Sequence, residues 1–280
     1  MFDPMQVVVD ALYIYPVKAC AGLRVPSLQF SDQGLINGDR QWVVVNGEAE
    51  VVWQGSHPRL ALVHPHTAPG FLHLSGPDGQ TLTIPNPPPR DAPCQVKIWN
   101  SSLQRNEIFD GIDAGDAAAA LLKHITGAAL RLVRLDATAW VRGTVNPCHI
   151  ASNASMAELN AAQATQGLSA VEIGRFRPNI VISSGQSELD PFVEEYCTQL
   201  RWQDAGRTAL LAVQAEPCIR CIVPNVDLRT AAKGDQPLET VTRLSADRHP
   251  GQPAYFGIYA RPQQAATLQQ GAQLELVLNF

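Results

Sequence analysis

The chain has 280 residues, a mass of 30.3 kDa and a formal net charge of −5. This length fits one large domain or two ordinary ones, long enough to bury a core without disulfide or metal staples. The acidic balance argues against a general nucleic-acid or membrane-surface binder, so any anion site must be a local cluster of cations. No stretch approaches the ~20 apolar residues of a membrane span, and no signal peptide is recognisable. We therefore expect a cytoplasmic protein that binds neither nucleic acid nor membrane.

Short β-like segments dominate the first part of the chain. Residues 6–15 are rich in β-branched and aromatic side chains and end at Pro16, which predicts a strand. Further strands are predicted for residues 40–45, 60–63, 71–74 and 81–84, with Gly, Pro, Asn and Asp between them. The Pro-rich run at residues 85–93 excludes a helix or a central strand and indicates a stiff connector.

Helical patterns appear in the middle of the chain. Alanines and leucines over residues 115–125 predict a helix that ends at Gly127. Ser155 and Glu158 form a capping-box pattern, which predicts a second helix running to about Thr165. Residues 130–135, 180–182, 207–213, 255–260 and 274–278 are β-like. Because the strands do not alternate regularly with helices, the sequence predicts a mainly β fold with a few helices, of the α+β class.

Two cysteines and an arginine lie close together in a turn-rich segment. Cys218 and Cys221 flank Arg220, and the chain's six cysteines are too sparse for a disulfide framework. The pair could be half of a zinc site, a thioredoxin-type redox pair, or the source of one thiolate for a soft transition metal. A zinc site needs a second ligand pair, and the spacing of Cys148-His149 matches no ribbon or finger. The pair could also be two small buried side chains in a turn.

Cationic residues occur near strand ends at widely separated positions. Lys18 follows the first predicted strand, Arg40 begins another, and Arg175, Arg177 and Asn179 precede a third. Each alone is typical of a surface charge or a structural ion pair, whereas together they would suit a phosphate group. No GxGxxG, GxxxxGK[ST], GxSxG or HExxH motif is present, which disfavours common NAD, ATP, serine hydrolase and zinc protease sites.

Five motifs in order resemble a known family. Tyr-Pro-Val-Lys at residues 15–18 and Gly-Asp-Arg at 38–40 resemble the start of the MOSC N-terminal β-barrel domain. Residues 175–181, 217–227 and 255–259 resemble the MOSC domain, in the amidoxime-reducing and hydroxylaminopurine-detoxifying subgroup. The resemblance spans nearly the whole chain. It implies an N-terminal β-barrel domain over residues 1–125 and a MOSC β-barrel domain over 126–280.

The resemblance also implies a molybdenum cofactor, in which molybdopterin and one protein cysteine hold the metal. Cys221 matches the family's cysteine and is expected to be both the metal ligand and the catalytic residue, because thiolate is a soft donor. Asp227 is expected to shape the cysteine loop or to touch the pterin. The positions matching the family's cofactor contacts are Lys18, Arg40, Ser152, Arg177, Asn179 and Asp227.

The implied activity is two-electron reduction of a small N-hydroxylated compound, such as a hydroxylaminopurine or an amidoxime. The chain carries no cluster of four cysteines for an iron–sulfur centre. Electrons are therefore expected from a separate ferredoxin- or flavodoxin-type protein with its reductase. Two alternatives remain open: a non-catalytic carrier of the cofactor or of sulfur, and a structural zinc or thiol-switch protein that uses Cys218 and Cys221.

Overall fold

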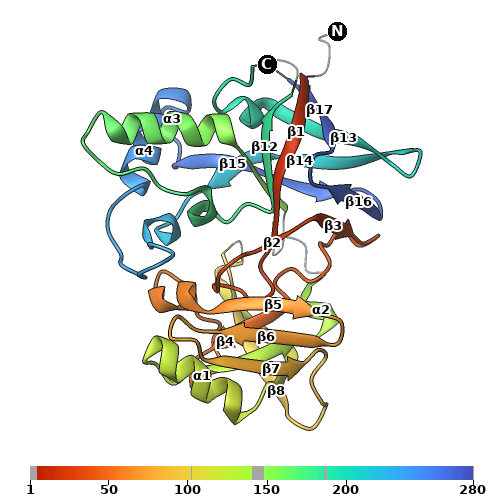
Figure 1. The fold of residues 1–280 in the computed structure, drawn as a ribbon, viewed down its shortest axis with the longest axis vertical. Helices are drawn as coiled ribbons and strands as arrows, with labels where there is room; N and C mark the ends of the chain where they lie inside the picture. The colour runs from red at the N-terminus through yellow and green to blue at the C-terminus, as the bar shows by residue number, and fades with distance from the viewer. Residues whose placement is uncertain (1–4, 102, 141–147, 186–187, 280) are drawn as a thin grey trace.

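The computed structural model describes residues 5–101, 103–140, 148–185 and 188–279. Seven of the described strands close into a barrel, in the upper part of Figure 1. In ring order they are β1 (Met5–Ile14), β12 (Ile180–Ser184), β11 (Cys148–Ser152), β15 (Tyr255–Pro262), β14 (Arg207–Ile219), β13 (Cys197–Asp204) and β17 (Gln273–Leu278), which pairs with β1. β11 and β12 are parallel, and the other neighbours in the ring are antiparallel.

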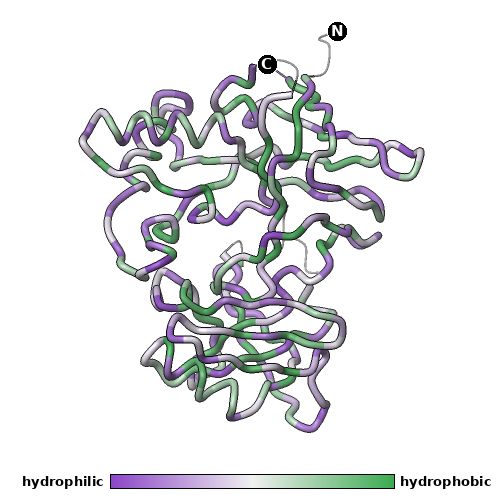
Figure 2. Tube along the Cα trace, viewed as in Figure 1, coloured by the Kyte–Doolittle hydropathy of each residue, from purple (hydrophilic) through white to green (hydrophobic). Residues whose placement is uncertain are grey.

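The barrel encloses a core of aliphatic side chains. Val7 and Val9 of β1 are both 1% exposed, as expected for alternate residues that point into a barrel. They pack with residues such as Leu200, Ile258 and Leu274 from the other strands. Figure 2 shows the hydrophobic stretch along β1, between strands that reach it from the second part of the chain. The first predicted strand is therefore central to the barrel.

Most of the described residues between β1 and β11 form the lower part of Figure 1, which is the first part of the molecule; the barrel is the second part. The first part contains a four-stranded sheet of β4 (Trp42–Val45), β10 (Arg131–Leu135), β9 (Arg105–Asp113) and β8 (Pro93–Asn100), and a three-stranded sheet of β5 (His64–Ala68), β6 (Phe71–Ser75) and β7 (Thr81–Pro85). Side chains such as Trp42, Leu72 and Leu132 fill the core between the sheets. The other face of β4 and β8 packs into a second cluster that includes Val43 and Ile98.

Strands near the start of the chain join the barrel side of the molecule. β2 (Leu23–Val25) pairs with β1, and β3 (Ser27–Phe30) pairs with β16 (Ala266–Gln269). Strands within the first 30 residues thus hydrogen-bond with each other or with strands from the last hundred or so residues of the chain. The division between residues 125 and 126 stays a prediction. The predicted mainly β architecture with a few helices is confirmed.

The described helices cover the two parts from outside. They are α1 (Asp116–Thr126), α2 (Ala137–Trp140), α3 (Asn153–Ala164) and α4 (Leu238–Arg248), with 3-10 turns η1 (Pro58–Leu62), η2 (Ile173–Phe176), η3 (Val193–Tyr196) and η4 (Val223–Asn225). As predicted, α1 ends at Gly127, whose φ of 77° suits a glycine C-cap. α3 and α4 lie together beside the barrel in Figure 1. Met156 and Leu159 of α3 and Val241 of α4 belong to one hydrophobic cluster.

Two sequence predictions of local structure are wrong. Residues 60–63 do not form a strand, because Pro58 begins the 3-10 turn η1, in which Leu60 and Ala61 are fully buried. The capping box at Ser155 is also wrong, because α3 begins at Asn153 and the Ser152 side chain caps it. Helix α4 was not assigned from the sequence, since β-like and turn-like residues surround it.

Candidate functional site

A cavity of about 620 Å³ lies where the two parts of the molecule meet. The first part contributes Lys18, Ala19, Arg40, Val51, Trp53, Gln54 and Trp99 to its wall, and the second part contributes His149, Phe176, Arg177, Ile219, Arg220, Cys221, Val223 and Tyr259. Four of these residues are cations, and no described acidic side chain lines the cavity. An acidic protein thus has a local site suited to an anion.

Backbone pairing brings Lys18 and Arg40 together. The amide of Lys18 donates to the carbonyl oxygen of Trp42 at 2.8 Å, and the amide of Arg40 donates to that of Tyr15 at 2.8 Å. The segment after β1 therefore runs beside the segment that enters β4. Ala19 and Arg40 both have positive φ, of 71° and 49°, an uncommon conformation that concentrates at functional sites.

The Arg40 side chain is fixed on several sides. It forms an ion pair with Asp39, whose carboxylate also accepts a hydrogen bond from the Tyr15 amide at 2.6 Å. Burial lowers the pKa of Arg40, but the Asp39 carboxylate together with Tyr15 and Tyr259 raises it above its usual value overall. Arg40 Nη1 also donates to Asn179 Oδ1 at 3.4 Å, which links the two parts of the molecule behind the cavity wall.

Arg177 reaches the same place from the second part. It follows η2, has a φ of 57°, and donates from Nη1 to the carbonyl oxygen of Cys20 at 2.7 Å. Its guanidinium lies 4.2 Å from the centre of the Tyr15 ring. Burial lowers the pKa of Arg177 to about 10. Its Nη2 is buried and has no hydrogen-bond partner among the described residues, so one donor remains for a bound molecule.

The segment after β14 presents the thiol of Cys221. Cys221 is exposed, whereas Cys218 is buried. Arg220 between them donates from Nη2 to the Phe176 carbonyl oxygen at 3.0 Å, and its Nη1 lies 2.8 Å from the Cys218 sulfur. The two thiols therefore have different roles: Cys218 holds the arginine, and Cys221 is left accessible at the cavity.

His149 and Tyr259 form the barrel side of the cavity wall. Their rings lie 5.7 Å apart on neighbouring strands β11 and β15. Burial, and next the positive charge of Arg220, lower the pKa of His149 to about 3, so its imidazole is neutral at ordinary pH. Burial and then the nearby Cys218 raise the pKa of Tyr259, so its hydroxyl keeps its proton.

Gln54, Trp53 and Trp99 line the other side. Gln54 is only 1% exposed, and neither its Oε1 nor its Nε2 has a hydrogen-bond partner in the described part of the chain. Buried amide groups without partners are rare in folded proteins, which indicates that something else satisfies them. Trp53 and Trp99 are 41% and 57% exposed, high values for large aromatic side chains.

Three of the residues predicted to bind the cofactor do not line this cavity. The Ser152 hydroxyl accepts a hydrogen bond from the Ser155 amide at 3.0 Å and so caps helix α3. Asn179 is fully buried; its Oδ1 binds Arg40 and the His149 amide, and its Nδ2 donates to the Tyr13 carbonyl oxygen at 3.1 Å.

Asp227, the third such residue, fixes the loop that follows Cys221. Its Oδ2 lies 2.5 Å from Arg175, and its Oδ1 accepts hydrogen bonds from the amides of Arg229 and Thr230 at 3.0 and 2.9 Å. These contacts hold the segment from Asp227 to Thr230 in place, and the predicted roles of Asp227, at the cysteine loop or the pterin, stay predictions. The structure therefore brings Lys18, Arg40, Arg177 and Cys221 to one cavity and places Ser152, Asn179 and Asp227 behind its wall or away from it.

Sequence reasoning missed several residues of the wall. His149 was considered only as a possible zinc partner, and Trp53, Gln54 and Trp99 carried no motif. An isolated glutamine or tryptophan in a β-rich sequence looks the same whether it faces a cavity or solvent. The zinc alternative finds no support, since the described residues contain no group of three or more His, Cys, Asp or Glu placed to hold a metal ion.

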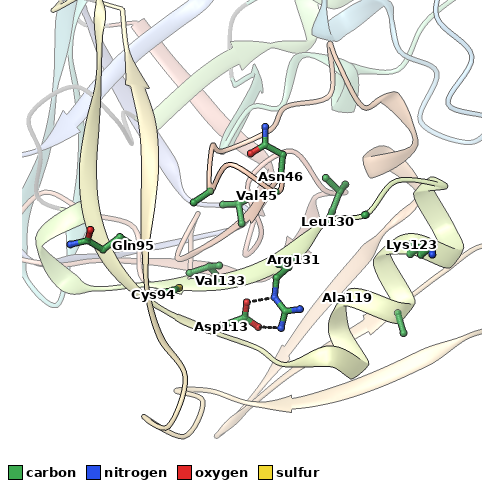
Figure 3. Close-up of a pocket in the computed structure, with 14 residues that line it drawn as sticks. Val45, Asn46, Cys94, Gln95, Asp113, Ala119, Lys123, Leu130, Arg131 and Val133 are labelled. Carbon is green, nitrogen blue, oxygen red and sulfur yellow. Dashed lines mark hydrogen bonds and ion pairs between the residues drawn. The ribbon is translucent and has the colours of Figure 1, made fainter.

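A second cavity, of about 470 Å³, lies in the first part between α1, β8 and β10 (Figure 3). Its wall is largely apolar. Figure 3 shows Arg131 and Asp113 paired with each other inside it. Cys94, on its wall, has a pKa raised by burial and then by the Asp113 carboxylate, which disfavours the reactive thiolate. Its charged pair is thus already satisfied, and the first cavity is the better candidate site.

The motifs around the first cavity agree with comparisons to known proteins. Residues 6–129 match the MOSC N-terminal beta barrel domain, and residues 140–275 match the MOSC domain. The chain belongs to the MOSC domain family. The predicted resemblance is confirmed, and the two matches together cover nearly the whole chain.

The chain is also similar to proteins of known name. The chain is 29% identical over 257 residues to mitochondrial amidoxime reducing component 2 of Rattus norvegicus, covering 83% of this chain and 71% of that protein. It is 27% identical to mitochondrial amidoxime-reducing component 1 of Homo sapiens, covering 96% and 82%. It is 31% identical over 262 residues to the molybdenum cofactor sulfurase of Drosophila grimshawi, covering 89% and 31%.

This MOSC protein thus spans about a third of the sulfurase and most of the amidoxime reducing components. Among solved structures, the YUAD protein from Bacillus subtilis is 14% identical, with a TM-score of 0.42 and full coverage of both chains. In the described part of this chain, no helix combines the length and apolar character needed to cross a membrane.

Proposed function

We propose that this chain binds a molybdenum cofactor in the cavity between its two parts and reduces N-hydroxylated compounds with electrons from a separate protein. The observation that carries the proposal is the meeting of Lys18, Arg40, Arg177 and the exposed Cys221 thiol around one cavity. The names of the amidoxime reducing components support the reaction class.

The residues present fit such a cofactor. A molybdopterin is an anion with a phosphate group, and the cavity wall has four cations and no described acidic side chain. Arg177 Nη2 and Arg220 Nε are buried and have no hydrogen-bond partner among the described residues, so donors remain for a bound group. Cys221 supplies the single soft donor that a molybdenum ion needs from the protein.

Several residues of the wall, and Cys218 next to it in the chain, then have a definite task. Lys18, Arg40 and Arg177 hold the anionic part of the cofactor, and Cys221 ligates the metal through its thiolate. Tyr259 keeps its phenolic proton, and Cys218 holds Arg220 against the cysteine loop. When bound, the cofactor supplies two-electron oxygen-transfer chemistry. In the overall reaction the N–O bond breaks, two electrons and two protons are taken up, and the hydroxylamine or amidoxime becomes the amine or amidine plus water.

The test begins with metal and pterin analysis of protein purified from a molybdenum-replete host. We expect molybdenum near one per chain, reduction of 6-hydroxylaminopurine with a strong artificial electron donor, and loss of both on Cys221→Ser. Cys94→Ser, which changes another thiol outside this cavity, should leave both unchanged. Bound cofactor without turnover of any N-hydroxylated compound would instead identify a carrier. Zinc near one per chain without molybdenum would end the proposal.

A further inference from the structure

The wall of the cavity carries several exposed apolar side chains. Trp53, Trp99 and Ile219 are 41%, 57% and 48% exposed, and all three line the same cavity. Exposed apolar groups that gather at a concave surface mark ligand-binding or interaction sites. An anionic cofactor would use the cations of the wall. The exposed apolar side chains are suited instead to an apolar, planar part of a bound molecule.

The two tryptophans come from adjacent segments. The Val51 amide donates to the Lys97 carbonyl oxygen at 2.9 Å, within a parallel bridge between this segment and β8. Trp53 and Trp99 each lie two residues beyond this hydrogen bond, so both segments deliver a tryptophan to the same end. A Cβ at Gly55 would lie 2.3 Å from the Trp53 ring, so that indole rests directly on the Gly55 backbone, which fixes its orientation.

Gln54 adds a polar group beside these rings. Its side-chain amide offers one acceptor and two donors, all without a partner in the described part of the chain. A neighbouring donor and acceptor match the edge of a nitrogen heterocycle, as glutamine does when it binds adenine. Indole faces, in turn, stack on any planar conjugated ring.

We propose that Trp53, Gln54 and Trp99 recognise the planar heterocyclic part of the substrate, which makes this site selective for N-hydroxylated purines and related bases over aliphatic amidoximes. The indoles cover the apolar faces of the ring, and the Gln54 amide hydrogen-bonds its polar edge. This assignment rests on the proposed reduction of N-hydroxylated compounds for its substrate class. Ile219 extends the apolar surface on the side of the cysteine loop.

A protein docking surface is the competing use of such side chains. Leu103 and Ile108, on the same β8–β9 hairpin, are also exposed, at 52% and 61%, but neither lines the cavity. Ile108 lies diagonally opposite Trp99 on the outer face of the hairpin, since Trp99 pairs with Asn106. Ile108→Ala is therefore a matched control that removes exposed apolar surface from the hairpin and leaves the cavity intact.

The experiment measures binding to the purified protein by calorimetry without an electron donor, so that no ligand is consumed. The two probes are 6-hydroxylaminopurine and acetamidoxime. We expect Trp99→Ala and Gln54→Ala each to raise the Kd for the purine about ten-fold, with Trp99→Phe retaining most of the affinity. Binding of acetamidoxime, the molybdenum content, and purine binding by Ile108→Ala should stay within two-fold of the wild-type values.

Three results would overturn the assignment. Loss of molybdenum in Gln54→Ala would mean that this amide holds the cofactor, and equal weakening of both probes would mean that no planar selectivity exists. A separate turnover assay covers the remaining case. If Trp99→Ala and Ile108→Ala both raise only the concentration of electron-donor protein needed for turnover, these side chains form a docking surface. If the wild type binds the purine in this way but reduces no N-hydroxylated compound, the proposed reaction fails while the recognition site stands.

Discussion

The backbone of Gly257 lies directly against the imidazole of His149. A Cβ at Gly257 would come within 2.6 Å of His149 Nε2 and 2.4 Å of the Ile150 carbonyl oxygen, and the φ of 74° there also disfavours a side chain. This close approach of β15 to β11 leaves His149 Nε2 3.2 Å from the Phe256 carbonyl oxygen. One glycine thus sets the position of a cavity wall residue.

Gly257→Ala should therefore destabilise the protein strongly. The left-handed backbone costs ~1–2 kcal/mol for a residue with a Cβ, and the two contacts add to it. We expect the midpoint of thermal unfolding to fall by at least several degrees. Gly251→Ala is the matched control, because Gly251 has a φ of 75° but no atom within 4 Å of the added Cβ. Equal shifts for both variants would mean that strain alone, and not the contact with His149, requires the glycine.

The buried His149 predicts a loss of stability in mild acid. Its pKa is about 3 in the folded protein, against an ordinary value of 6.5, so the unfolded chain binds more protons between these pH values. This contribution is fully present above pH 6.5 and declines as pH falls toward 3, by up to about 1.4 kcal/mol per pH unit. The free energy of unfolding of His149→Gln, measured by urea titration, should depend less on pH between 6.5 and 4.5. Replacement of His66, whose side chain is exposed, is the control for the loss of a histidine outside the core.

Ser152→Ala tests whether this serine caps a helix or contacts the cofactor. Loss of the hydrogen bond from the Ser155 amide should lower the free energy of unfolding by about 1 kcal/mol. Because Ser152 does not line the cavity, the molybdenum content per folded chain should equal that of the wild type. A fall in molybdenum content at an unchanged free energy of unfolding would instead show that Ser152 contacts the cofactor.

Arg177→Ala should weaken cofactor retention, because it removes a cavity cation whose Nη2 has no hydrogen-bond partner in the described part of the chain. We expect several-fold less molybdenum per chain after gel filtration, with a cooperative unfolding transition preserved. Arg134→Ala is the matched control. Burial also lowers the pKa of Arg134 to about 10, and its guanidinium lies 4.3 Å from the Trp140 ring centre, but it does not line this cavity. Loss of metal in both variants alike, or a collapsed transition in Arg177→Ala, would mark Arg177 as structural.

The sequence by itself determined the fold class and the family. Pattern and composition gave the mainly β architecture, and the order of five motifs gave the MOSC domains, which the family matches confirm. The motifs also pointed to Cys221, Lys18, Arg40 and Arg177, and the structure places all four at one cavity. The sequence alone can identify the family and these four residues because each motif is a short run of neighbouring residues.

Only the tertiary structure decided which side chains share the cavity. Tyr15 and Pro178 are 163 positions apart, yet the Tyr15 hydroxyl donates to the Pro178 carbonyl oxygen at 3.1 Å, because β1 pairs with β12. The same long-range pairing hides Asn179 behind Arg40, and the fold buries Gln54 with no hydrogen-bond partner for its amide among the described residues. Burial and orientation depend on residues distant in the chain, so no local pattern could have separated a wall residue from a helix cap such as Ser152.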